Sequence, residues 1–422
     1  MKKTMILAAC LMIWPTIRAQ QAQNGEQLPV ARLEQQVLML ENDMALLKQL
    51  KVSGYIQTQF QYGEKDASLK VGAPKAGGDE DYNRFGIRRG RLKFEYEKKL
   101  ISGVFQIDLT EKGIGLKDAY LAVKAPQLGS SSFKAGVFNR PFGYEVSYSS
   151  SKRESPERAT VITTLFPEER DLGAMISLQA SKDSPWNIMK LEAAVIGGNG
   201  VKMDMDNRKD FIGRLSAGKV FGDRFAVGAG TSYYWGGVYQ GTENVYRMKG
   251  KTFEAEIIDS NKGAFAKREY FGFDGQFSAI TPFGISQLSA EFITGTQPGD
   301  KNSSKSPNYA ALPTSDTYVR SFSGGYVAYV QDLGALPLSL VVKYDYYDPN
   351  TKVSRDEIGS NGTGKADIAN SAFGAGLLWR MNGNMRLTAY YDWVWNEQTA
   401  NLTTYGGDLK DDVFTLRLQY KF

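Results

Sequence analysis

The sequence contains no histidine, and its single cysteine, Cys10, lies close to the N-terminus. The lack of histidine excludes Ser-His-Asp and Cys-His catalysis as well as histidine-ligated zinc sites. Because Cys10 falls in a leader, we expect neither a disulfide nor thiol chemistry in the processed chain. No apolar run reaches the roughly 18 residues that a membrane-spanning helix requires, so a membrane form of this chain would have to span by β-strands.

The chain also lacks a strong excess of charge of either sign. It has 51 Lys and Arg against 46 Asp and Glu, a formal net charge of +5. This mildly basic balance does not by itself indicate a nucleic-acid partner. The length of 422 residues allows either two or three ordinary soluble domains or one large barrel.

The N-terminus has the layout of an export signal. Lys2 and Lys3 precede the apolar run 4–14, which is long enough for a signal-peptide core and too short to cross a bilayer as a helix. We expect a signal peptide over 1–19. The alternative is a lipoprotein signal, in which the sequence LAAC ends at an acylated Cys10. Both interpretations predict export.

The segment 28–50 has a helical period that appears nowhere else. Its apolar side chains are spaced 4, 3, 4 and 3 residues apart, as in an a/d seam of about three heptads; they are Leu33, Val37, Leu40, Met44 and Leu47. We predict a periplasmic linker and a short self-associating coiled-coil helix within 20–51. A lone amphipathic helix packed on its own domain is the alternative.

From Ser53 onward the apolar period becomes two. Segments of about ten residues alternate apolar with polar side chains, which is the length that a tilted strand needs to cross the hydrocarbon. Clear examples are 53–63, 338–347, 385–395 and 412–422. We count about sixteen such segments. Short turns such as 221–224 and 381–384 alternate with long polar loops at 66–81, 140–171, 240–263, 296–316, 348–369 and 396–410.

Alternation alone would also fit a soluble β-sandwich, but three features favour a membrane barrel. Charges recur at mid-strand, with too little other apolar material for a separate core. Aromatics cluster near strand ends, where membrane interfaces favour Tyr and Trp. The chain ends on Phe422, the last apolar residue of an alternating strand. The sequence therefore predicts an all-β fold over 52–422: a transmembrane antiparallel β-barrel of about 16 strands in the outer membrane of a Gram-negative bacterium.

The order and spacing of several stretches over about 370 residues resemble the phosphate-selective porin O and P family. These stretches are KVSGYIQTQFQ, FGIRRGRLKFE, LKDAYLAV, FKAGVFNRPFGYE, FPEERDLGAMI, GGNGVKMDMDNRKDFIGRL and the terminal QYKF. No single one is specific. The resemblance implies a sixteen-stranded barrel, usually a trimer, with loops folded into each pore. It also implies an arginine ladder that passes phosphate or polyphosphate.

The most basic stretch, RFGIRRGRLKFEYE at 84–97, supplies the first candidate pore residues. If one side of the strand faces lipid, Arg89, Arg91 and Lys93 face the lumen, about 7 Å apart along it. The apolar side consists of Leu92, Phe94 and Tyr96. Arg88 has the parity of the lipid side, so it lies either near the interface or at a bulge. The alternative to a permeation role is that these cations pair with nearby acids and merely solvate the wall.

The loop 140–171 is predicted to fold into the pore. It has six acidic and five basic residues, so its composition does not indicate anion selectivity. Several of these charges are expected to form ion pairs that hold the loop in place. Arg140 and Arg170 are our candidates for pore-facing positions. Ser155 and Pro156 could start a short helix. Lys134 and Arg214 lie on the polar parity of their strands and complete the candidate anion-binding set.

These observations predict a channel rather than an enzyme, with no cofactor and no metal. The expected function is passive diffusion of small anionic solutes, with phosphate or polyphosphate as candidate cargo, through a lumen lined by Arg and Lys. Expected partners are outer-membrane lipid, small anions such as phosphate and two further copies of the chain in a homo-trimer, without nucleic acid. Open alternatives are a general porin without phosphate preference, a structural or adhesive surface barrel, a barrel hydrolase and a soluble carbohydrate binder.

Overall fold

The computed structural model describes residues 37, 39 and 49–422. The predicted signal peptide, Cys10 and nearly all of the predicted coiled-coil helix lie outside the described residues, so these remain predictions. The described chain from Gln49 onward forms one compact unit. None of the helices among the described residues is long and apolar enough to cross a membrane.

Strands dominate the described residues. Those of the barrel wall are β1 (Leu50–Gly63), β2 (Tyr82–Lys98), β3 (Ile101–Thr110), β4 (Gly113–Ala125), β5 (Ser131–Asn139), β6 (Arg170–Gln179), β7 (Met189–Ile196), β8 (Asp210–Phe221), β9 (Phe225–Tyr239), β12 (Phe265–Thr281), β13 (Gly284–Gly299), β14 (Thr317–Asp332), β15 (Leu338–Asp348), β16 (Asn370–Arg380), β17 (Met385–Asn396) and β18 (Val413–Lys421).

The remaining elements are short and lie in the connections. They are the strands β10 (Asn244–Lys249) and β11 (Thr252–Ile257), the helix α2 (Thr160–Leu165) and the 3-10 turns η1 (Pro126–Leu128), η2 (Pro185–Ile188), η3 (Asp259–Asn261), η4 (Arg355–Glu357), η5 (Lys365–Asp367) and η6 (Thr403–Tyr405).

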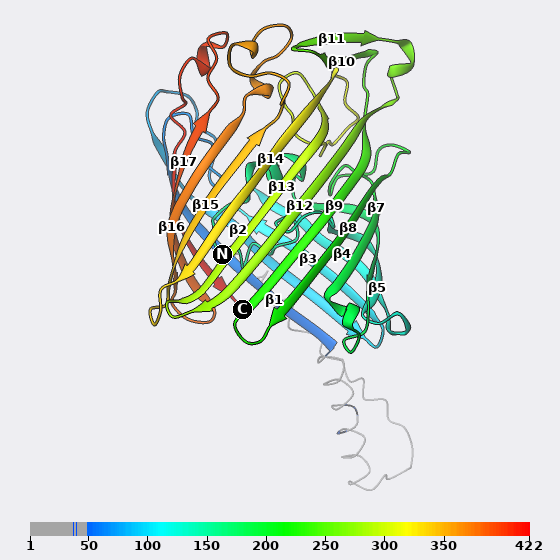
Figure 1. Cartoon of the computed structure of the whole chain (residues 1–422), viewed down its shortest axis with the longest axis vertical. Coiled ribbons are helices and arrows are strands. Elements are labelled where there is room, and N and C mark those ends of the chain that lie inside the picture. Colours follow the sequence, from blue (N-terminus) through cyan, green and yellow to red (C-terminus); the bar gives the residue numbers. More distant parts are fainter. Residues whose placement is uncertain (1–36, 38, 40–48) are drawn as a thin grey trace, which may run out of the picture. The chain divides into compact units, whose positions relative to one another are not determined.

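The wall strands of the described chain form one closed antiparallel sheet of sixteen (Figure 1), which confirms the predicted fold class. Each strand pairs with the next along the chain, and β9 pairs with β12 past the β10–β11 hairpin. Pairing of β1 with β18 closes the ring. Phe422 extends this seam, because its backbone N–H donates to Gly54 at 3.0 Å and its carbonyl accepts from Gly54 at 3.1 Å. Closure leaves no unpaired sheet edge in the hydrocarbon.

Apolar side chains point away from the barrel axis and polar ones toward it. On β2, Phe85 is 77% exposed, whereas Arg89 and Arg91 on the other face are 3% and 5% exposed. A basic side chain on the lipid face near the bilayer midplane would cost about 2–4 kcal/mol, so the lumen is the favourable side for these arginines. The outward apolar surface, together with a closed barrel, is the arrangement of an outer-membrane protein.

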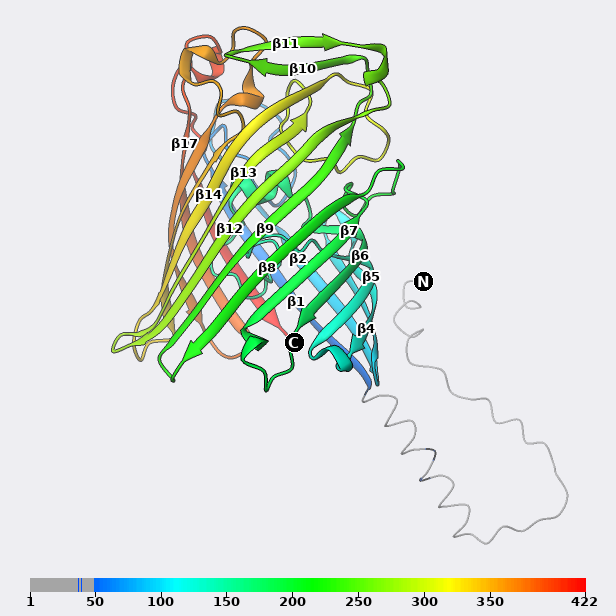
Figure 2. The ribbon, with the colours of Figure 1, turned by 45° about the vertical axis from the view of Figure 1, so that its right-hand side comes forward.

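The connections differ at the two ends of the barrel. Short turns at 222–224 and 381–384 join β8 to β9 and β16 to β17, as the sequence predicted, at the end where the C-terminus lies (Figure 1). The longer loops emerge at the opposite end, where the β10–β11 hairpin lies over the barrel rim (Figure 2). β10 also runs parallel to the start of β14, with Tyr246 opposite Tyr318.

The connection between β5 and β6, residues 140–169, packs against the inside of the wall and is called the inner loop below. Its helix α2 buries Val161, Ile162 and Leu165. The helix begins at Thr160, not near Ser155 as the sequence suggested. The reason is that the Ser155 and Pro156 carbonyls accept hydrogen bonds from the Arg153 guanidinium, so this segment is organised by side-chain contacts.

Candidate pore lining

Arg88 reaches the lumen through a β-bulge. In the β1–β2 pairing Gln57 lies opposite Arg89 and Thr58 lies opposite Ile87, so Arg88 is the extra residue. A bulge changes the direction of the side chain that it contains. The sequence left two explanations open for the parity of Arg88, a position near the interface or a bulge. The structure shows that the bulge is the correct one.

Arg88 and Arg89 meet on one carboxylate of the inner loop, that of Glu157. The Nε and Nη2 atoms of Arg88 each donate to it at 2.8 Å, which is the bidentate fork geometry. Arg89 Nη2 lies 3.3 Å from the same carboxylate, and Arg417 Nη2 on β18 lies 2.6 Å from it. We call this group the Glu157 cluster. It ties the inner loop to both strands that flank β1.

The charge of Glu157 is favoured by its surroundings. Burial alone would raise the pKa of this loop carboxyl, but the positive charges of Arg88, Arg89 and Arg417 hold that pKa well below its usual range. Glu157 is therefore ionised at neutral pH. Its negative charge offsets part of the positive charge that the three guanidinium groups bring into the lumen.

Most of the other predicted pore residues are also paired. Arg91 lies 3.4 Å from Asp108, and Lys93 lies 2.6 Å from Glu95 on its own strand. The remaining pairs are Arg140–Asp171 at 2.9 Å, Arg170–Asp118 at 3.2 Å, Arg170–Glu169 at 2.8 Å and Arg214–Asp274 at 2.5 Å. Arg140 and Arg170 lie together where the inner loop leaves and rejoins the wall. The others are distributed over separate strands.

Lys134 differs from the rest of the predicted set. Within the described residues it has no carboxylate at salt-bridge distance, and its ammonium lies 5.1 Å from the Tyr120 ring centroid and 5.8 Å from that of Phe138. Its side chain is half-buried on the lumen side of β5. Among the eight predicted positions, Lys134 thus has the cation that is most available to a passing anion.

Backbone contacts hold the start of the inner loop against the opposite wall. The Glu291 carboxylate on β13 accepts hydrogen bonds from the backbone N–H groups of Tyr144 and Glu145, at 3.1 and 3.0 Å. Gly143 has a φ of +57°, and a Cβ there would lie 1.7 Å from Glu291 Oε1. Only glycine fits this approach. Lys343 on β15 lies 3.4 Å from Glu145 and adds an ion pair.

Apolar packing joins the two ends of the inner loop. Phe142 and Phe166 lie 4.9 Å apart between ring centroids, and Phe166 meets Tyr270 of β12 edge-on at 5.8 Å. These rings belong to a buried cluster that includes α2 and side chains from β8, β9 and β12–β15. Paired charges on one side and a small apolar core on the other therefore hold the loop across the lumen.

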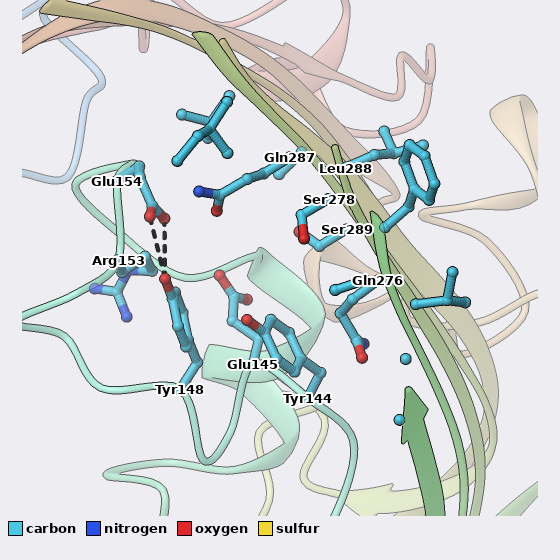
Figure 3. Close-up of a pocket in the computed structure, with 18 of the residues that line it drawn as sticks. Tyr144, Glu145, Tyr148, Arg153, Glu154, Gln276, Ser278, Gln287, Leu288 and Ser289 are labelled. Atoms are coloured by element: carbon cyan, nitrogen blue, oxygen red, sulfur yellow. Dashed lines mark hydrogen bonds between the residues drawn. The ribbon is translucent and has the colours of Figure 1, made fainter. Parts of the chain in front are cut away.

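The lumen keeps an open cavity of 590 Å³ beside the inner loop. The loop contributes Tyr144, Tyr148 and Glu154, and the facing wall comes from β8, β9 and β12–β15 (Figure 3). The Tyr148 hydroxyl donates to Glu154 at 3.1 Å. A solute that passes the loop on this side meets aromatic and polar groups.

Several of these residues were not identified from the sequence as a site. Glu157 was counted only among the acids of the loop, and Arg417 was not in the candidate set. They are 260 residues apart, and no local pattern indicates that they share an ion pair. The tyrosines of the cavity gave no signal either, because tyrosine is common throughout the chain. The Asn-Arg-Pro-Phe-Gly run at 139–143 did contain a signal, since glycine is the residue that permits a positive φ and a close approach of its backbone.

The sequence matches no protein-family model and no curated protein sequence. Solved structures with the same architecture include the trimer form of OmpT, an outer membrane protein of Vibrio cholerae, with 13% identity, a TM-score of 0.52 and coverage of 88% of this chain and 99% of that one. The anion-selective porin from Comamonas acidovorans shares 10% identity over 88% and 99% of the two chains, at a TM-score of 0.52.

OprB of Pseudomonas putida shares 10% identity over 91% of this chain and 97% of that one, at a TM-score of 0.55. At such identities the likeness shows a common fold. The resemblance to phosphate-selective porins therefore stays a prediction. The chain is a porin-type barrel, and its closed sheet and apolar exterior place it in the outer membrane of a Gram-negative bacterium.

Proposed function

We propose that the chain forms a water-filled channel for passive diffusion of small hydrophilic solutes across the outer membrane. The observation that supports this most is the 590 Å³ cavity between the inner loop and a polar wall inside a closed barrel. A lumen whose ion pairs line a water-accessible space suits conduction better than a packed apolar interior would. The inner loop narrows the passage and so sets the size of solute that passes.

The proposed preference for anions, phosphate among them, rests on the basic residues of the lumen. Among the described residues, Lys134 has no carboxylate at salt-bridge distance. Lys93 on β2 adds a second ammonium, which Glu95 of its own strand holds at 2.6 Å. The six arginines of the predicted set are proposed to act mainly as positioning residues, because each is engaged by a carboxylate. Weak and separated sites suit conduction, since an ion must also leave.

The second candidate is a general porin without phosphate preference. The pairing of the arginines favours it, because a guanidinium that already holds a carboxylate has fewer donors for a phosphate oxygen. Transport rather than catalysis is proposed for both candidates. A homo-trimer is proposed by analogy with the trimer form of the Vibrio cholerae protein.

Single-channel recording of the purified chain in a planar bilayer tests this proposal. We expect discrete conductance steps in KCl and a reversal potential, under a KCl gradient, that shows chloride to be more permeant than potassium. Added phosphate would reduce the chloride current if the phosphate preference holds. A folded barrel that gives no current in KCl would contradict the channel function, and equal permeability of both ions would favour the general porin.

A further inference from the structure

One wall of the cavity beside the inner loop carries polar side chains without charge. The positions of β12 and β13 that line it include amide and hydroxyl side chains and no ionisable group. Gln276 lies directly opposite Ser289, and Ser278 directly opposite Gln287, in the β12–β13 register. Directly opposed residues of an antiparallel pair have Cβ atoms about 4.5–5.5 Å apart, so these four form one compact group. We call it the amide–hydroxyl patch.

The patch has hydrogen-bonding capacity to spare. Within the part of the chain that the structure describes, no hydrogen bond engages the side chains of Ser278, Gln287 or Ser289, and they line the cavity. Gln276 donates from Nε2 to Asp274 at 2.8 Å, which leaves its carbonyl oxygen as a further acceptor. These groups are therefore available to water or to a solute that replaces it.

Aromatic rings of the inner loop face the same space (Figure 3). Tyr144 and Tyr148 stack with ring centroids 5.1 Å apart and an interplanar angle of 24°. Small residues occupy several lining positions of the wall, among them Gly218, Gly228 and Ala328. The cavity thus combines flat aromatic surface and the uncharged donors and acceptors of the wall with charged side chains, among them Arg153 and Glu154 of the inner loop.

We propose that this cavity is a binding subsite for an uncharged polyhydroxylated solute of the size of a monosaccharide or disaccharide. The ring of such a solute offers apolar C–H surface to the tyrosines and hydroxyl groups to the amide–hydroxyl patch. A phosphate ion would find no cation on the β12–β13 wall and would favour the side of Lys134. The inference rests on the proposed channel function and adds a substrate class to it.

The test records KCl current through the full chain in a planar bilayer while glucose or sucrose is added. We expect each sugar to reduce the current along a saturating curve. An ethylene glycol oligomer of similar mass should reduce it only in proportion to its concentration, as a viscous solute does. Gln287→Leu keeps a similar volume and removes the amide, and it should raise the sugar concentration for half block about tenfold, the effect of losing one or two neutral hydrogen bonds.

Gln106→Leu is the matched control, because Gln106 is a buried polar residue of β3 paired with Lys93 and Asp118 on the opposite side of the barrel. It should leave the sugar block as in the unaltered chain. The subsite alone is overturned if the channel conducts but its current responds to the sugars only as it does to the glycol oligomer. It is also overturned if both variants shift the sugar concentration for half block equally. A folded barrel that conducts no KCl overturns the channel function, which is a different result.

Discussion

Replacing Glu157 by glutamine tests how the Glu157 cluster holds the inner loop. Glu157→Gln keeps the shape of the side chain and removes its negative charge, so three guanidinium groups lose their shared partner. The Glu157 side chain is 21% exposed, and Arg89 and Arg417 are each 4% exposed. Breaking a buried ion pair at one partner costs about 3–5 kcal/mol, and partial access to lumen water lowers this toward the smaller figure.

A cost of about 3 kcal/mol corresponds to a shift of roughly a hundredfold in the equilibrium between the docked and released positions of this loop segment. The apolar cluster around Phe142 and Phe166 is untouched, so the barrel should still fold. We expect larger and noisier unitary currents, because the loop segment moves. We also expect the reversal potential in a KCl gradient to shift toward chloride, because the lumen gains one unit of positive charge.

Glu154→Gln is the matched control. Glu154 lies in the same loop but its hydrogen bonds are with the Tyr148 hydroxyl, not with an arginine. It should change the current noise much less than Glu157→Gln does. Unitary currents and reversal potentials of Glu157→Gln that match those of the unaltered chain would refute the account of the Glu157 cluster.

Three further predictions follow from single positions. Lys134→Gln should move the reversal potential toward potassium, whereas Lys134→Arg should preserve it; equal values for both would exclude a role for this cation. Gly143→Ala should loosen the inner loop by about 1–3 kcal/mol, because the new Cβ meets Glu291 and a φ of +57° disfavours alanine; higher current noise is the readout, and quiet channels would contradict it. Leu121→Arg places a charge on an outward position that is 65% exposed. At mid-membrane depth it should lower the free energy of folding into lipid vesicles by about 2–4 kcal/mol, and an unchanged urea midpoint would show that Leu121 does not face lipid.

The fold was predictable because lipid-facing and lumen-facing positions alternate along each strand of a membrane barrel, and the sequence alternates apolar and polar residues in the same way. Arg91 and Tyr96 fall on opposite faces as the period of two requires. The parity conflict of Arg88 left an interface position and a bulge both open, and it is the bulge that puts Phe85 and Arg89 on opposite faces. The pairing partners were not predictable, because they come from segments far apart in the chain. Glu157 meets Arg88 and Arg417 only after the ring has closed, and nothing near any of these residues in the sequence encodes that contact.

The role of the arginines shows the same limit. A row of basic residues on a lumen-facing strand fits either an anion path or a set of anchors for the loop. Local pattern cannot separate the two, since both require cations that point inward. The carboxylates that decide between them lie on other strands and on the inner loop, as Asp118 does for Arg170.

Chemical modification of the channel at position 134 tests the central claim most directly. Lys134→Cys in a chain that also has Cys10→Ser carries a single thiol, and a negatively charged, water-soluble methanethiosulfonate reagent can be added during single-channel recording. If water and ions pass through the lumen beside β5, each modification should change the unitary current in one abrupt step and lower the share carried by chloride. Conductance steps that persist unchanged while the thiol is shown to have reacted would mean that the current does not run past this residue, and the proposed channel would be contradicted.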